Sequence, residues 1–133
     1  MVVVDTSVAI KWFFDEADSP QARSLLKNEA IGAPDLLSYE FANYLAMKNF
    51  VTSEDARHFV DQLYALPVQM FILPQKGLRR AVELAKRFRL TAYDASFVAL
   101  AETLKVDLVT ADAKLVQKAK QLSFVKLLGS SST

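Results

Sequence analysis

Four acidic residues lie where a carboxylate can bind a metal ion: Asp5, Glu40, Asp94 and Asp112. Each follows a predicted strand or lies on an otherwise apolar helix face. If all four met, their charges would repel and raise one another's pKa values. A hard, oxygen-seeking cation such as Mg²⁺ or Mn²⁺ removes that penalty. The sequence therefore predicts a divalent-metal centre built from these carboxylates.

Glu40 and Asp94 carry the strongest physical argument. Glu40 lies within the apolar stripe of its predicted helix, and acidic side chains are rarely buried without a partner or a metal. The alternative for Glu40 is a structural ion pair. Asp94 shares a helical face with apolar residues three, four and seven positions on. Its alternative is a capping box with Thr91, although Glu or Gln is the usual fourth residue.

Asp5 and Asp112 are placed by strand ends. Asp5 follows a β-branched run and Asp112 lies just past another short strand, and ligands of open α/β sheets bind at the carboxyl ends of strands. The alternative for both is helix capping. Thr6 and Ser7 can also cap, which leaves Asp5 less needed for that role. Thr110 offers a hydroxyl that can hold a carboxylate or a metal-bound water.

Short strands alternate with helices along the chain, which predicts a parallel sheet with helices on both faces. The predicted strands cover residues 2–4, 31–34, 68–73, 107–110 and 124–128. The predicted helices cover residues 8–14, 19–28, 36–50, 53–65, 75–87, 91–105 and 112–121. We expect one domain over residues 1–128 and a frayed C-terminal tail over residues 129–133.

The composition limits the class of protein. The chain has 133 residues, of which 52% are hydrophobic, so we expect one compact domain with a substantial core. The absence of cysteine excludes disulfides, thiol catalysis and thiolate zinc sites. No apolar run approaches the roughly 18 residues that span a bilayer, and no basic segment precedes an apolar stretch. We predict a soluble cytoplasmic protein that does not associate with membranes.

The charges are unevenly distributed although the net charge is only +1. Residues 1–66 hold five basic and ten acidic residues, whereas residues 67–133 hold eleven basic and five acidic ones. Six bases are concentrated around one predicted helix: Lys76, Arg79, Arg80, Lys86, Arg87 and Arg89. They are candidates for phosphate contacts or for an acidic protein segment, with a solvated helix face as the alternative. The one histidine, His58, is expected at the surface rather than as a general acid.

Four motifs resemble those of PIN domains and occur in the same order as in that family. They are residues 2–7 (VVVDTS), 39–43 (YEFAN), 91–97 (TAYDASF) and 108–112 (LVTAD). The whole chain resembles VapC-type toxins, the ribonuclease half of prokaryotic toxin–antitoxin pairs. The resemblance implies a three-layer α/β/α PIN-like fold with a short, mostly parallel central sheet.

The resemblance also implies an activity and partners. It implies an endoribonuclease that depends on Mg²⁺ or Mn²⁺, usually a homodimer, held inactive by a small antitoxin protein. It casts Asp5, Glu40, Asp94 and Asp112 as catalytic, metal-binding carboxylates. The supporting polar groups would be Thr6 or Ser7, Asn43 and Thr110. Many relatives carry a further acid where this chain has Lys114, which puts a firmly held second metal in doubt.

The expected mechanism follows from hard-cation chemistry. A metal held by Asp5, Asp94 and Asp112 would activate a water and polarise the scissile phosphate, and in-line attack would displace the ribose 3′ oxygen. Glu40 would orient the water or complete the metal shell. One alternative is a catalytically silent PIN-like binding module. Another is a phosphohydrolase with Asp5 as nucleophile, but that chemistry usually needs an acid where Ser7 stands.

A protein-binding surface is a further hypothesis from the sequence. Trp12, Phe13 and Phe14 form an aromatic run in the first helix. They are either part of a dimer or antitoxin surface or ordinary core residues.

Overall fold

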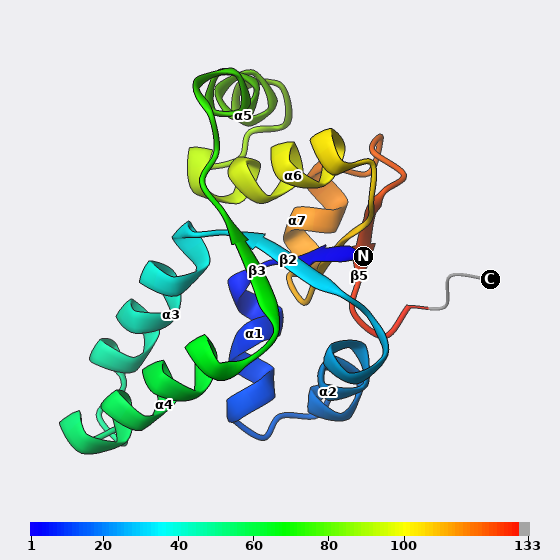
Figure 1. The fold of residues 1–133 in the computed structure, drawn as a ribbon. Coiled ribbons are helices and arrows are strands. Elements are labelled where there is room, and N and C mark those ends of the chain that lie inside the picture. The colour runs from blue at the N-terminus through cyan, green and yellow to red at the C-terminus, as the bar shows by residue number, and fades with distance from the viewer. Residues whose placement is uncertain (131–133) are drawn as a thin grey trace.

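The computed structural model describes residues 1–130 and places a parallel sheet between two groups of helices (Figure 1). The strands are β1 (Val2–Val4), β2 (Ile31–Pro34), β3 (Val68–Phe71), β4 (Leu108–Thr110) and β5 (Val125–Leu127). Their order in the sheet is β3-β2-β1-β4-β5, and all four pairings are parallel. The predicted α/β class with a parallel sheet is therefore confirmed.

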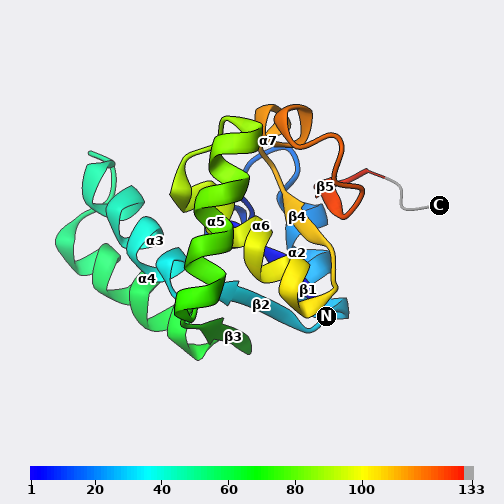
Figure 2. The same cartoon turned by 90° about the horizontal axis from the view of Figure 1, so that it is seen from above.

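Seven helices within residues 1–130 connect and cover the strands. They are α1 (Thr6–Phe13), α2 (Ser19–Asn28), α3 (Leu36–Met47), α4 (Ser53–Ala65), α5 (Gln75–Phe88), α6 (Ala92–Leu104) and α7 (Ala113–Lys118). The helices α1 to α4 lie on one side of the sheet and α5 to α7 on the other (Figure 1). Figures 1 and 2 both show α3 and α4 side by side, extending away from the sheet. None of the helices in residues 1–130 is long and apolar enough to span a membrane.

The strand order creates a crevice between β1 and β4. From β1 the chain moves through β2 to β3, and then returns to β4 on the other side of β1 before continuing to β5. The reversal makes the carboxyl ends of β1 and β4 a topological switch point, where open α/β sheets form their ligand sites. Asp5 directly follows β1 and Asp112 lies two residues past β4.

The core is built on the central strands and on α6. Val3, Val4 and Leu108 are completely buried, as expected for strands covered on both faces. The run from Ala95 to Ala101 in α6 is buried throughout, because α6 lies between the sheet and α5. This sandwiched position fixes the N-terminal end of α6, which carries Asp94.

Several predicted boundaries were wrong, and those of α1 and β3 have a local cause. The helix α1 begins at Thr6 rather than at residue 8, because Asp5 itself caps it. The strand β3 ends at Phe71 rather than at residue 73, because its only partner strand, β2, ends at Pro34. The helix α3 ends at Met47 rather than at residue 50, and α7 ends at Lys118 rather than near residue 121.

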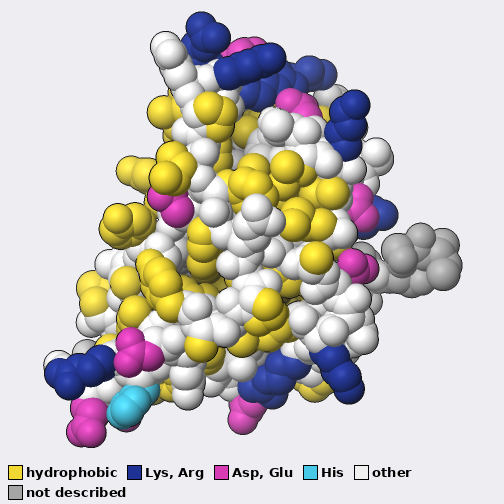
Figure 3. Space-filling view, viewed as in Figure 1, with side chains coloured by type: hydrophobic (Ala, Val, Ile, Leu, Met, Phe, Trp, Pro, Cys, Tyr) yellow, Lys and Arg dark blue, Asp and Glu magenta, His cyan; other side chains and the backbone are white. Residues whose placement is uncertain are grey.

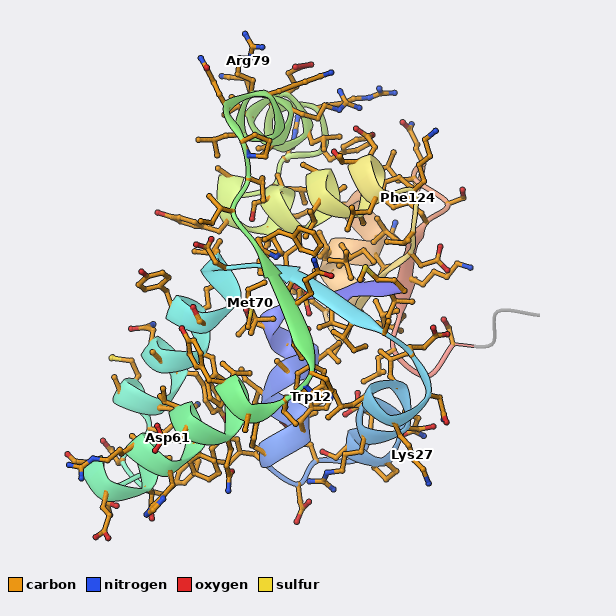
Figure 4. The ribbon with its side chains drawn as sticks, viewed as in Figure 1. Trp12, Lys27, Asp61, Met70, Arg79 and Phe124 are labelled. Carbon is orange, nitrogen blue, oxygen red and sulfur yellow. The ribbon has the colours of Figure 1, made fainter. Side chains whose placement is uncertain are left out.

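The aromatic run of α1 contributes to the core rather than forming a free surface. Trp12 is only 7% exposed, and its indole N–H donates to the Ala22 carbonyl at 2.9 Å, which joins α1 to α2 (Figure 4). The half-buried rings of Phe13 and Phe14 pack against Phe59, 6.0 Å and 4.8 Å away between ring centroids. The core alternative is therefore confirmed for Trp12, whereas Phe13 and Phe14 pack against the core and stay partly exposed.

The C-terminal tail was predicted to be frayed from residue 129. Gly129 has φ +82, a conformation that glycine adopts without strain, and the Ser130 backbone N–H donates to the Leu127 carbonyl at 3.0 Å. Residues 129 and 130 thus form a turn at the end of β5. The rest of the predicted tail lies outside the described residues.

The central position of α6 leads to a stability prediction. Replacing Phe97, which is 1% exposed, with alanine should lower the free energy of unfolding by about 3–5 kcal/mol, because it opens a cavity between α6 and the sheet. Tyr64 on α4 is 68% exposed, and Tyr64→Ala should change stability by less than about 0.5 kcal/mol. Urea unfolding of both variants tests this. A Phe97→Ala cost no larger than that of Tyr64→Ala would contradict the packing described for α6.

Candidate metal centre

A cleft of about 580 Å³ opens at the switch point and is lined by all four predicted carboxylates, Asp5, Glu40, Asp94 and Asp112. They come from four separate places in the chain: the ends of β1 and β4, the middle of α3 and the first turn of α6. Thr6, Ser7 and Asn43 line the same cleft. The fold therefore brings together side chains that are up to 107 positions apart in the sequence.

Asp5 is the most constrained member of this group. It is only 7% exposed, and two hydroxyls donate to its carboxylate: Ser7 to Oδ1 and Thr110 to Oδ2, each at 2.5 Å. The Val8 backbone N–H also donates to Oδ1, at 3.3 Å, so Asp5 is the N-cap of α1. The expectation that Thr6 and Ser7 would relieve Asp5 of capping was wrong. Asp5 caps the helix and lines the cleft at once, because its two oxygens face different partners.

The hydroxyls that hold Asp5 also fix the loop after β4. Ser7 Oγ accepts from the Ala111 backbone N–H at 2.9 Å, and Thr110 Oγ1 accepts from the Asp112 backbone N–H at 3.0 Å. Each hydroxyl therefore donates to a carboxylate and accepts from the backbone. The sequence left open whether the Thr110 hydroxyl holds a carboxylate or a metal-bound water, and in the structure it donates to the carboxylate of Asp5.

Asp112 combines capping with exposure to the cleft. Its Oδ1 accepts from the backbone N–H groups of Lys114 and Leu115 at 2.9 and 3.4 Å, so it is the N-cap of α7. Capping uses one carboxylate oxygen. Lys114 is exposed on α7 and does not line the cleft.

Glu40 and Asp94 are half-buried in the cleft wall. Glu40 Oε1 accepts from the Thr6 hydroxyl at 2.6 Å, and no ion pair to Glu40 occurs within residues 1–130. The Thr91 hydroxyl accepts from the Asp94 backbone N–H at 3.0 Å, which is one half of a capping box. The reciprocal bond, from the Thr91 backbone N–H to the Asp94 carboxylate, does not occur in the described chain. The carboxylate of Asp94 is thus left to line the cleft.

The electrostatics of the cleft favour a cation. Burial is the main cause that raises the pKa of Asp5, to about 6, with the charge of Asp94 adding to it and the hydrogen bonds from Ser7, Thr110 and Val8 opposing it. Burial is also the main cause that raises the pKa of Glu40, and repulsion from Asp94 adds to it. The pKa of Asp94 is raised in the same way, by burial first and then by repulsion from Asp112. Asp94 therefore interacts electrostatically with each of the other three carboxylates.

The donor set fits a hard, partly hydrated cation. All candidate ligands are oxygen atoms, which suit Mg²⁺ or Mn²⁺. Within residues 1–130, no three acidic or histidine side chains are close enough together to hold a metal ion directly. Mg²⁺ rarely needs such a cage, because it keeps several waters and binds one or two carboxylates together with substrate phosphates. Water-mediated contacts are consistent with carboxylates spread around one cleft.

The rim of the cleft contains residues that sequence reasoning did not single out. Tyr39 and Tyr93, which directly precede Glu40 and Asp94, line the cleft and are 72% and 63% exposed. Lys118 is close enough to Asp94 to lower its pKa, against the larger opposing effects of burial and Asp112. The sequence did contain a signal for Tyr39 and Tyr93, because each directly precedes one of the predicted carboxylates. The position of Lys118 depended on how α7 packs.

Lys and Arg side chains gather at the α5 end of the molecule (Figure 3), and the predicted phosphate-binding bases divide into two groups along and beyond that helix. Arg87 and Arg89 lie at its C-terminal end, next to the start of α6. Lys76 and Arg79 lie in its first half, where Arg79 points away from the body of the molecule (Figure 4). Arg80 donates two hydrogen bonds to Glu102 on α6, at 2.7 and 3.0 Å, so its guanidinium is already engaged. His58 is exposed on α4 and does not line the cleft, as predicted.

The comparisons with known proteins agree with this architecture. The family model described as PIN domain matches residues 2–121. Ribonuclease VapC9 of Mycobacterium tuberculosis is 38% identical over 119 residues, covering 86% of this chain and 88% of the relative. The chain therefore belongs to the PIN-domain family, and within it to the VapC type.

Two solved structures share the fold. VapC20 of Mycobacterium tuberculosis, a sarcin–ricin loop cleaving toxin, superposes with a TM-score of 0.72 at 15% identity, covering 94% of this chain and 97% of that one. VapBC2 of Rickettsia felis, bound to a fragment of promoter DNA, gives a TM-score of 0.69 at 16% identity, covering 96% and 97%. At these identities the likeness concerns the fold alone.

The raised pKa of Asp5 predicts a pH-dependent effect of neutralising it. Its pKa is 3.8 when unfolded and about 6 when folded, so ionised Asp5 destabilises the metal-free fold above pH 6, and the penalty disappears as the pH falls towards 4. Metal-free Asp5→Asn should therefore be more stable than the wild-type protein at pH 7.5, with the difference shrinking by pH 4.5. Thermal unfolding in EDTA at both pH values measures this.

Asp112→Asn is the matched control for this prediction. Asparagine caps helices as well as aspartate, and the residue is exposed, so its effect should stay within about 0.5 kcal/mol. An Asp5→Asn variant that is less stable than the wild-type protein at pH 7.5 would contradict the prediction. It would show that the hydrogen bonds from Ser7, Thr110 and Val8 offset the whole cost of burying the Asp5 charge.

Proposed function

We propose that this protein is a divalent-metal-dependent endoribonuclease and the toxin of a toxin–antitoxin pair, acting in the cytoplasm. The observation that carries the proposal is the convergence of four carboxylates in one cleft, three of them with raised pKa values. Such a cluster has no structural use as an ion pair, since none of the four forms a salt bridge within residues 1–130. The relative from Mycobacterium tuberculosis is named as a ribonuclease, and this name supports RNA as the substrate.

We assign the binding of Mg²⁺ or Mn²⁺ to Asp5, Asp94 and Asp112. The hydroxyls of Ser7 and Thr110 hold the Asp5 carboxylate in one orientation, so it loses little freedom when it binds a cation. A bound cation would polarise the scissile phosphate and lower the pKa of a water molecule. The exposed Asn43 would contact the substrate or a water at the edge of the cleft.

Glu40 has a different role in this proposal. Its Oε1 accepts from Thr6, which leaves Oε2 facing the cleft without a hydrogen bond within the described chain. Burial raises the pKa of Glu40, which brings it closer to that of a group able to accept a proton near neutral pH. Glu40 would therefore orient the attacking water and accept its proton, while Thr6 fixes the direction of the carboxylate.

The proposed partners are an antitoxin and a second copy of the chain. A structural neighbour from Klebsiella pneumoniae is a toxin–antitoxin complex, which supports an antitoxin for this chain too. Large apolar side chains remain exposed on α3 and α5, among them Met47 at 71% and Leu78 at 54%. Apolar surface of this kind supports coverage by another polypeptide.

The activity is tested with single-stranded RNA and Mn²⁺ or Mg²⁺. The wild-type protein should cleave the RNA, EDTA should stop cleavage, and Asp94→Asn should lower the rate on the order of 100-fold or more, because Asp94 interacts with every other carboxylate of the cleft. Gel electrophoresis of end-labelled RNA gives the rates.

Asp61→Asn is the matched control, since Asp61 is exposed on α4 and does not line the cleft (Figure 4). It removes the same charge and should cleave at the wild-type rate. Equal cleavage by wild-type protein, Asp94→Asn and the EDTA sample would point to a contaminating nuclease and overturn the proposal. Absence of cleavage from every sample would favour a catalytically silent binding module.

A further inference from the structure

A second hollow of about 580 Å³ lies where the end of α5 meets α7, and it is strongly basic. It is lined by Arg87, Phe88, Arg89, Lys118, Lys120 and Gln121. None of these lining residues is acidic. Four of them are basic: Arg87, Arg89, Lys118 and Lys120. Within residues 1–130, none of these four side chains forms a salt bridge with a carboxylate, whereas Arg80, Lys11 and Lys126 each form one or more. The hollow thus concentrates positive charge that forms no salt bridge within residues 1–130.

Contacts within the hollow hold its cations in place. Lys118 Nζ donates to the Arg89 carbonyl at 3.3 Å, which joins the end of α7 to the end of α5. The Arg87 guanidinium lies 5.1 Å from the ring centre of Phe88 and donates to Gln121 Oε1 at 3.5 Å. These contacts engage neutral groups only. The charges therefore stay available for an anion.

The hollow adjoins the acidic cleft. Lys118 is within electrostatic range of Asp94, and Arg89 is three residues before Ala92, where α6 begins. The other side of the cleft has a different character, because it is lined mainly by apolar and aromatic residues such as Tyr39, Tyr44 and Met47. Of the cleft's lining residues in the described chain, Lys48 on the α3 side is the one base, whereas the neighbouring hollow towards α7 has four.

We propose that the hollow formed by Arg87, Arg89, Lys118 and Lys120 binds a backbone phosphate of the RNA next to the one that is cleaved. This inference rests on the proposed ribonuclease function. Four carboxylates repel a polyanion even when one divalent cation is bound, so a strand needs compensating positive charge close by. A strand with one phosphate at Asp94 places a neighbouring phosphate on a flank of the cleft, and this flank is the basic one.

Another explanation for these bases is the helix dipole. Cations are favourable at helix C-termini, where all four of these lie. That explanation predicts an effect on stability and none on RNA binding. An acidic segment of a protein partner is a second possibility, and it predicts binding of acidic peptides in preference to RNA.

The test replaces Arg89 and Lys120 together, as Arg89→Gln and Lys120→Gln. Glutamine removes the charge and keeps the unbranched stem as far as Cδ, and at position 89, where φ is +59, it avoids the strain of a β-branched residue. Lys118 is left unchanged because it acts on Asp94 directly. The matched control is Lys76→Gln with Arg79→Gln, which removes two exposed charges from the other end of α5. Both double variants change the net charge equally.

Binding is measured in EDTA, so that it does not depend on cleavage. Fluorescence anisotropy follows a labelled single-stranded RNA oligonucleotide over a range of KCl concentrations, and an oligoglutamate peptide serves as the competing anion. The Arg89/Lys120 variant should bind the RNA about tenfold more weakly than the wild-type protein. The slope of log affinity against log salt should fall by about 0.7, for the one phosphate contact that is lost. The Lys76/Arg79 control should change by less than half as much.

Two results would overturn the proposal. One is equal weakening in the two double variants, which would mean that net charge alone matters. The other is binding of oligoglutamate but not of RNA at this hollow, which would assign it to an acidic protein segment. A parallel cleavage assay with Mn²⁺ separates this proposal from the proposed function. If the wild-type protein and both variants cleave equally well, the phosphate-binding hollow is refuted while the ribonuclease function stands.

Discussion

The buried carboxylate of Asp5 is the constraint on which the site depends. It lies at the point where the sheet reverses its strand order, and it is held by hydroxyls from α1 and from β4. The same two hydroxyls accept backbone N–H groups from the loop that carries Asp112. Removing Ser7 or Thr110 would therefore free Asp5 and loosen the position of Asp112 together. The remaining destabilisation of ionised Asp5, expressed as a pKa of about 6, is what a cation would relieve.

Much of the fold was predictable because local chemistry agreed with the tertiary structure. The strands β1 and β4 are short β-branched or apolar runs, and prolines or capping residues mark the ends of several elements. The sheet order was not predictable from the sequence, because no local signal states which strand lies beside β1. The end of β3 was missed for a similar reason, since β3 ends where its partner strand β2 ends. The end of α3 was missed as well.

The candidate site was predictable to the level of residue identity but not of contacts. Apolar neighbours marked Glu40 and Asp94 as unusual, and strand ends marked Asp5 and Asp112. Capping of α1 by Asp5 was one of the alternatives that the sequence left open. The sequence did not indicate that Thr6 would hold Glu40 or that Lys118 would approach Asp94. Each of these depends on how helices distant in sequence pack. The basic residues were likewise visible as a group, but only the structure separates Arg87 and Arg89 near the cleft from Lys76 and Arg79 away from it.

We propose that Asp5, Asp94 and Asp112 share one divalent cation and that Glu40 lies beside it in the same cleft, and Mn²⁺ titration followed by NMR tests this most directly. Paramagnetic broadening should affect first the backbone amides of residues 5–7, 40, 94 and 111–113, and it should saturate at one equivalent. The amides of Lys27 and Asp61, which do not line the cleft, should keep their intensity (Figure 4). The pattern should disappear in Asp94→Asn. Broadening that centres elsewhere, or that is unchanged in Asp94→Asn, would contradict the claim.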